Sequence, residues 1–195
     1  MSIVVTACLD EAASLTKEGM RLLDTYKESA SSFVPSFLSW VDGVQAMLER
    51  YKRSELTMVT AIKAKALAAR SGLLAADGVA LGKAAPRKRI AGACALLLSQ
   101  VLEALYGAQV ALEARKDEAA KPIQQILMLL MRDGRLEAAM RSSPTPGAML
   151  SSIWDYCRSA PDVSAGAPQV LSLVSLPDAL RLIDETLSQW SLADG

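Results

Sequence analysis

The chain has 195 residues, of which 51% are apolar and 22% charged, and its 21 basic residues balance its 21 acidic ones. This length suits one well-buried core, and the composition excludes a chain that is disordered throughout. Histidine is absent, which excludes hydrolases with a histidine base and metal centres with histidine ligands.

The first segment with helical periodicity lies near the start of the chain. Apolar residues recur every three or four positions from Ala12 to Phe33, which predicts a helix over about 8–32. Pro35 follows a pair of serines and is placed to open the next helix. Few aromatic residues, 5% of the chain, also favour helices over strands.

A second apolar stripe begins at Phe37 and keeps one phase, which predicts a single long helix over about 36–71. Gly72 follows as its C-cap. Glu55 is the one charged member of this stripe. Either the stripe drifts off Glu55 or the helix breaks at Ser54, or the carboxylate is buried and paired across helices to fix their register.

A loop or a short helix is expected over 72–86, and a third long helix over about 86–118. This third helix is apolar over most of its circumference, which is typical of the central helix of a bundle. Pro122 is expected to open a fourth helix, and a shorter helix is predicted over 135–141.

The remainder predicts shorter elements. A helix is expected over about 148–158, followed by a flexible connector over 159–168 that is rich in Pro, Gly and Ser. Residues 170–174 could form a short extended piece. Ser175 and Asp178 have the spacing of a capping box and open the last helix.

These elements predict an all-α helical bundle with three long helices and shorter C-terminal helices. Residues 1–142 would form the core of the bundle. Residues 143–195 would form a helical extension packed on it, so that the chain is a single domain.

No set of residues points to catalysis. The three cysteines, Cys8, Cys94 and Cys157, lie far apart without a metal-binding spacing, so they are expected to be reduced thiols in a cytoplasmic protein. We expect no metal, no cofactor and no catalytic residue, and therefore not an enzyme.

The neutral total charge hides an asymmetry. Residues 50–89 contain ten basic and two acidic residues, a net charge of +8, and the rest of the chain carries −8. These cations face an acidic partner, acids of the same fold, or water. Three of them share one flank of the helix predicted over 36–71, and three open the helix predicted over 86–118, where they oppose the helix dipole. The candidate partner-binding residues are Lys52, Lys63, Arg70, Arg87, Lys88 and Arg89.

We therefore expect a non-enzymatic adaptor, regulatory or assembly subunit that acts through contacts with another protein. One alternative is a helical subunit that grips nucleic-acid backbone through the basic segment 50–89. Another is a membrane-active bundle that uses the hydrophobic helix over 90–112. The incompletely covered stripes also allow a homo-oligomer.

Overall fold

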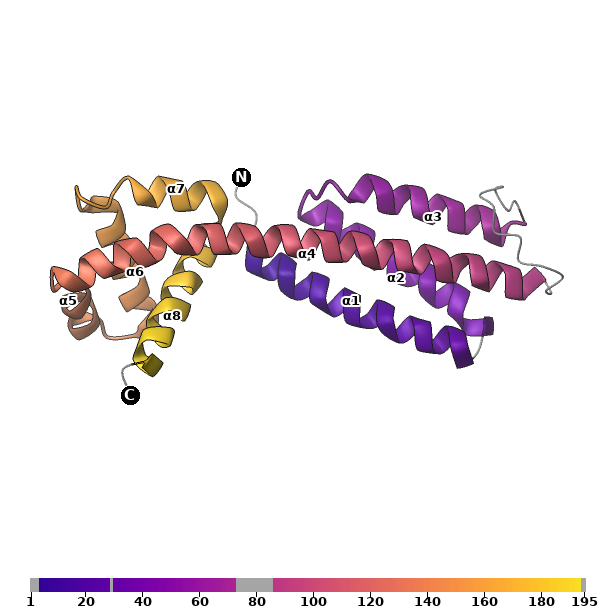
Figure 1. Cartoon of the computed structure of the whole chain (residues 1–195), viewed down its shortest axis with the longest axis horizontal. Coiled ribbons are helices and arrows are strands. Elements are labelled where there is room, and N and C mark those ends of the chain that lie inside the picture. Colours follow the sequence, from indigo (N-terminus) through magenta and orange to yellow (C-terminus); the bar gives the residue numbers. More distant parts are fainter. Residues whose placement is uncertain (1–3, 29, 73–85, 194–195) are drawn as a thin grey trace. The chain divides into compact units, whose positions relative to one another are not determined.

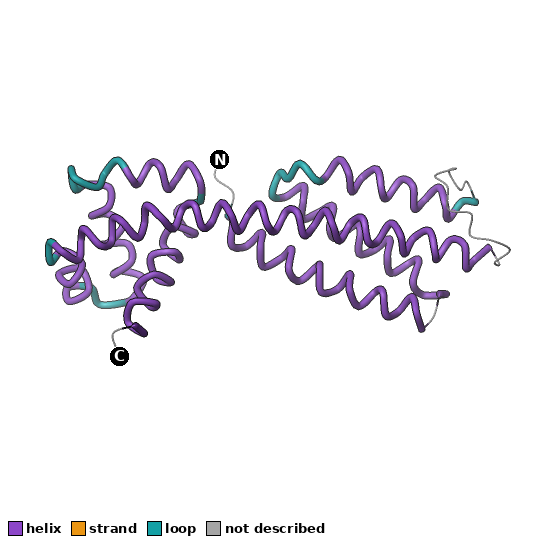
Figure 2. Tube along the Cα trace, in the orientation of Figure 1, coloured by secondary structure: helices purple, strands orange, loops and turns teal. Residues whose placement is uncertain are grey.

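The computed structural model describes residues 4–28, 30–72 and 86–193. These residues form eight α-helices and no strand, which confirms the predicted all-α bundle (Figures 1 and 2). The predicted loop over 72–86 lies almost entirely outside the described residues. The chain divides into two compact units, Ala7–Ala111 and Met1–Thr6 with Leu112–Gly195. This division falls within a helix, whereas the sequence placed a boundary after residue 142.

The first unit, which we call the bundle unit, is an up-and-down arrangement of four helices. Its helices are α1 (Val5–Glu28), α2 (Ala30–Arg50), α3 (Leu56–Arg70) and the first part of α4 (Pro86–Arg132). Three hydrogen bonds link neighbouring helices: Trp40 Nε1 to Leu15 O (2.9 Å), Gln45 Nε2 to Thr60 Oγ1 (2.9 Å) and Gln109 Nε2 to Thr16 Oγ1 (3.3 Å). Each helix runs antiparallel to the next, as in an up-and-down bundle (Figure 1).

The apolar stripes predicted from the sequence form the core of this unit. Their spacing of three and four residues places them on one face of each helix. The fully covered members include Phe37, Val41, Val44 and Leu48 of α2, Ile62 and Ala66 of α3, and Cys94, Val101, Leu105 and Ala108 of α4.

The single long helix predicted over 36–71 is wrong, because the chain turns back on itself after α2. The N–H of Lys52 donates to Glu49 O (3.0 Å) and that of Arg53 to Leu48 O (2.8 Å). These two bonds form a Schellman motif, which ends a helix at a residue with left-handed backbone. Lys52 has a φ of +52° and occupies that position. Glycine usually stands there, so the sequence carried no conventional stop signal.

We expect Lys52→Gly to raise the free energy of unfolding by about 0.5–1 kcal/mol, because glycine adopts the left-handed conformation without a clash of its side chain. Lys52→Ala removes the same side chain but keeps the clash, so it serves as the control. Chemical denaturation of both variants tests this prediction. Equal stability of the two variants would show that the backbone at this turn is unstrained.

The turn also decides between the alternatives for Glu55. The helix breaks over 51–55, as one alternative had it, and Glu55 precedes the first residue of α3. Its carboxylate pairs with Arg53 Nη2 at 3.0 Å and accepts a hydrogen bond from Ser54 Oγ at 3.2 Å. The half-buried carboxylate therefore binds within its own turn and does not pair across helices.

Two prolines were predicted to begin helices, but each lies inside a helix. Pro35 lies within α2, which begins at Ala30. Pro122 lies within α4, so the predicted break between a third and a fourth helix is also wrong. An internal proline costs about 3 kcal/mol of helix stability. In α4, burial of Ala119, Ile123 and residues further along the same face offsets this cost.

The second unit, which we call the C-terminal unit, contains the first two residues of α1, the end of α4 and four shorter helices. They are α5 (Arg135–Ser142), α6 (Pro146–Ser159), α7 (Gly166–Leu173) and α8 (Leu176–Ala193). Helix α6 packs against α5, α7 and α8. The extended piece expected over 170–174 is wrong, because most of it belongs to α7. The connector expected over 159–168 spans only 160–165, between the end of α6 and the start of α7.

The predicted capping box at the start of α8 is confirmed, and its carboxylate has a second role. Ser175 Oγ accepts from the N–H of Asp178 and Asp178 Oδ2 accepts from the N–H of Ser175, both at 3.4 Å, and Ser175 Oγ donates to Asp178 Oδ2 at 2.6 Å. Asp178 also accepts hydrogen bonds from the first backbone N–H groups of α1, those of Val5 (2.8 Å) and Thr6 (3.0 Å). One carboxylate therefore caps the starts of both α1 and α8, although Asp178 lies 172 residues after Thr6 in the sequence.

Candidate functional site

The structure separates the six residues predicted to bind a partner. Lys52 lies in the turn between α2 and α3, whereas Lys63 and Arg70 lie on α3. The prediction that all three residues share one flank of a single helix is therefore wrong. Arg87, Lys88 and Arg89 stand in the first turn of α4, as expected. Because α3 is 15 residues long, Lys52 and Arg70 lie at opposite ends of the bundle unit, roughly 20 Å apart.

Acids of the same fold neutralise part of the basic segment. Arg50 Nη1 contacts both carboxylate oxygens of Glu11, at 2.9 and 2.8 Å. Lys63 Nζ lies 2.5 Å from Asp42 Oδ1, and Arg53 pairs with Glu55. Internal pairing, one of the three expected roles of these cations, therefore applies to Arg50, Arg53 and Lys63.

A group of cations without such partners gathers at one end of the bundle unit. Helix α3 ends at Arg70, and α4 runs antiparallel to it from Pro86, so Arg70, Arg87 and Lys88 share this end (Figure 1). We call these three residues the basic end. Each is exposed, and none forms an ion pair with another described residue. Arg89 is half-buried and makes an interaction of its own.

The electrostatics of the basic end follow from its position. The N-terminus of a helix carries about half a positive charge from its unsatisfied N–H groups. The first turn of α4 contains no acid, so its basic residues add to this charge. Arg87 and Lys88 therefore contribute a positive potential that does not stabilise α4. Arg70 lies in the last turn of α3, where a cation interacts favourably with the helix dipole.

A second surface is formed by the side of α4 that faces away from the bundle core. Leu96, Tyr106 and Val110 are 49%, 66% and 46% exposed. From the sequence, we expected this helix to be the central one, because it is apolar over most of its circumference. In the described part of the bundle unit, only one side of the helix is buried against other helices. We call the line Leu96, Ser99, Glu103, Tyr106 and Val110 the outer face of α4.

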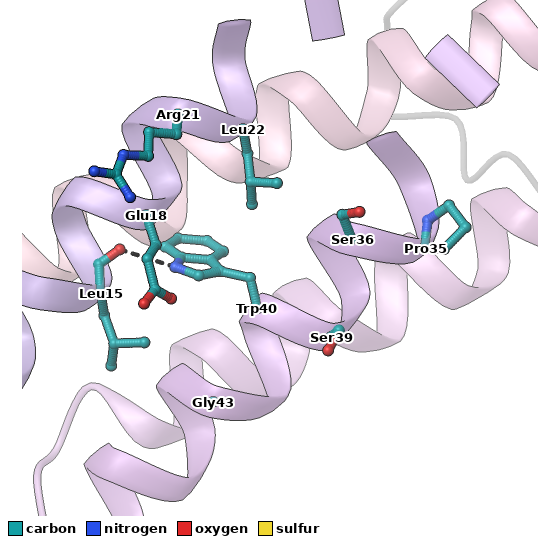
Figure 3. A pocket seen from close by; sticks show the side chains of 9 residues that line it. All are labelled: Leu15, Glu18, Arg21, Leu22, Pro35, Ser36, Ser39, Trp40 and Gly43. Carbon is teal, nitrogen blue, oxygen red and sulfur yellow. Dashed lines mark hydrogen bonds between the residues drawn. The ribbon is translucent and has the colours of Figure 1, made fainter. Parts of the chain in front are cut away.

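A groove between α1 and α2 has a volume of about 630 Å³ (Figure 3). Leu15, Leu22 and Trp40 provide its apolar lining, and Glu18 and Arg21 stand on the α1 side. The groove depends on close packing beneath it, because a Cβ on Gly19 would lie 2.5 Å from Trp40 Cζ2. Ser36 and Ser39 stand on the α2 side, so the groove lies where two helices pack and is lined by both polar and apolar side chains.

The cysteines are held in an unreactive state. Cys8, Cys94 and Cys157 are all buried and free. Burial raises the pKa of each thiol to about 11, so each is protonated at neutral pH. Among the described residues, no group of three or more Cys, Asp or Glu side chains is arranged to hold a metal ion.

Helix α4 is also long and apolar enough to cross a membrane, judged by length and composition. The most apolar stretch of this helix is 39% buried. Core helices of soluble bundles have the same properties, so this feature does not distinguish a membrane span from a bundle helix.

Comparison with known proteins adds no family. No family model matches the chain, and neither the curated proteins nor the solved structures include a match. The proposals below therefore rest on the geometry of the two surfaces.

Proposed function

We propose that this chain is a non-enzymatic adaptor or assembly subunit that binds an acidic surface of another protein through its basic end. The observation that carries the proposal is the set Arg70, Arg87 and Lys88, exposed at one end of the bundle and without an ion-pair partner among the described residues. The charges of Arg87 and Lys88 oppose the dipole of α4, so they do not serve the stability of that helix and are available to a partner. The three free thiols fit a cytoplasmic location.

Nucleic-acid backbone is the alternative ligand for the same cations. A polyanion that runs along the protein needs a track of cations, whereas internal pairing of Arg50, Arg53 and Lys63 interrupts the segment 50–89. Three phosphate contacts would lower the logarithm of the binding constant by about 2–3 per decade of salt. The confined geometry of the basic end favours a protein partner.

Reversal of charge at the basic end tests the proposal. We expect Arg87→Glu/Lys88→Glu to reduce recovery of the native partner by about tenfold or more, because like charges then face each other across the interface. Lys52→Glu, at the opposite end of the bundle, is the matched control and should leave recovery unchanged. The measurement is quantitative affinity purification from the native host.

Nuclease treatment of half the extract separates the two ligands. A protein partner should be recovered equally with and without nuclease. Loss of all binding after nuclease treatment would support the nucleic-acid alternative instead. If the double variant and the wild type recover the partner equally, the basic end does not bind it.

A further inference from the structure

The outer face of α4 is a line of exposed residues with an apolar side chain at each end, Leu96 and Val110, and one charge at its centre. Its members are spaced by three or four residues, which places them on one side of a helix. They lie opposite the buried line that contains Val101 and Leu105. Helix α1 runs along one edge of this face, where Leu102 packs against Gly19. The exposed side chain of Met20 follows Gly19 on α1.

Glu103 defines the chemistry of this face. It is the one charged residue between Ile90 and Leu112, and it is exposed. It lies seven residues from both Leu96 and Val110, so it stands midway between the two apolar ends of the line. Among the described residues, no cation pairs with its carboxylate.

This central carboxylate distinguishes between the candidate occupants. A second copy of the chain, packed by two-fold symmetry around the middle of the face, would bring Glu103 against its own counterpart, and like charges at such a distance repel. An anionic bilayer would repel the same carboxylate, whose burial in hydrocarbon is costly. A helix that offers a cation at this point gains both apolar contact and charge pairing.

We propose that the outer face of α4 binds an amphipathic helix of another protein, with Lys or Arg opposite Glu103 and apolar residues on either side. Leu96 and Val110 would anchor the two ends of the partner helix, and Tyr106 would pack beside the charge pair. Aromatic residues are enriched at such interfaces. This surface is separate from the basic end and has the opposite charge preference, so the chain would bind two partners of different chemistry.

Two labelled synthetic peptides serve as probes. Both are amphipathic 21-residue helices with leucine at seven-residue spacing, and they differ in one central residue, Lys or Glu. We expect the Lys peptide to bind the full-length protein at least about fivefold more tightly than the Glu peptide, measured by fluorescence anisotropy. Glu103→Lys should reverse this preference. Glu49→Lys, which makes the same charge change on the exposed side of α2, should preserve it.

Three results would overturn the proposal. The first is equal affinity, or no binding, for the two peptides. The second is a dimer in light scattering that Tyr106→Ser dissociates, since the occupant would then be a second copy. The third is binding to anionic phosphatidylserine vesicles that Tyr106→Ser abolishes. Arg87→Glu/Lys88→Glu should leave peptide affinity unchanged, which separates failure of this proposal from failure of the proposal for the basic end.

Discussion

Asp178→Ala is expected to lower the free energy of unfolding by about 3 kcal/mol, because it uncaps two helices at once. Asp178 is 3% exposed, so the N–H groups of Val5 and Thr6 would lose their acceptor in a place that water reaches poorly. Ser175 would lose its partner as well. Asp178→Asn keeps one acceptor oxygen and should cost about half as much. Denaturant unfolding, monitored by circular dichroism, measures both values.

The same carboxylate makes stability depend on pH. Burial alone would raise the pKa of Asp178, but hydrogen bonds from Ser175, Thr6 and Val5 outweigh burial and lower the pKa below its usual value. A folded-state pKa below the unfolded-state pKa means that the carboxylate stabilises the fold above the unfolded-state value. This contribution is lost as the pH falls through the folded-state value. The stability difference between wild type and Asp178→Ala should therefore be constant near neutral pH and shrink below about pH 4.

A difference that stays constant through the acid range would contradict this account of Asp178. It would mean that the carboxylate has the same proton affinity in the folded and unfolded chain. Loss of stability in Asp178→Ala would then come from packing and not from the caps.

Gly19→Ala is expected to destabilise the protein by about 2 kcal/mol, although alanine favours helices more than glycine does. The new methyl group would lie 2.5 Å from Trp40 Cζ2 and 2.8 Å from Leu102 Cδ2. The indole cannot move away freely, because its Nε1 donates to Leu15 O at 2.9 Å. Helices α1, α2 and α4 meet at this point, so the clash would push three helices apart.

Gly107→Ala is the matched control, because a Cβ at Gly107 meets no atom within 4 Å. This variant should gain up to about 1 kcal/mol from helix propensity alone. In a double-mutant cycle, Trp40→Phe should relieve part of the loss caused by Gly19→Ala, since the smaller ring vacates the position of Cζ2. Additive effects of Gly19→Ala and Trp40→Phe would show that the close approach does not constrain the packing.

The two proposed surfaces differ in how far the sequence revealed them. The cluster over 87–89 was recognisable because basic residues at a helix start oppose the dipole. Arg70 joins it only through the antiparallel packing of α3 and α4. The outer face of α4 was missed, since a helix with apolar residues on more than one side, such as Leu96 on one side and Leu98 on another, is usually buried all round.

The errors in helix boundaries have specific physical causes. Gly72 was correctly placed after a helix, and its backbone is left-handed, with a φ of +79°. Lys52 also has a positive φ but is not a glycine, so nothing in the sequence indicated that a helix ends there. Pro122 was taken as a helix start, yet burial of the residues around it keeps α4 continuous.

The sequence by itself determined the helical fold class, the inward faces of the long helices and the cap of α8, because these depend on residues within one or two turns of each other. Tertiary structure alone decided where the chain turns between α2 and α3, which cations are paired internally and which side of α4 stays uncovered. It also brings Asp178 to the start of α1, although Asp178 lies 172 residues after Thr6 in the sequence. Such choices depend on which helices become neighbours, and periodicity within one helix does not report its neighbours.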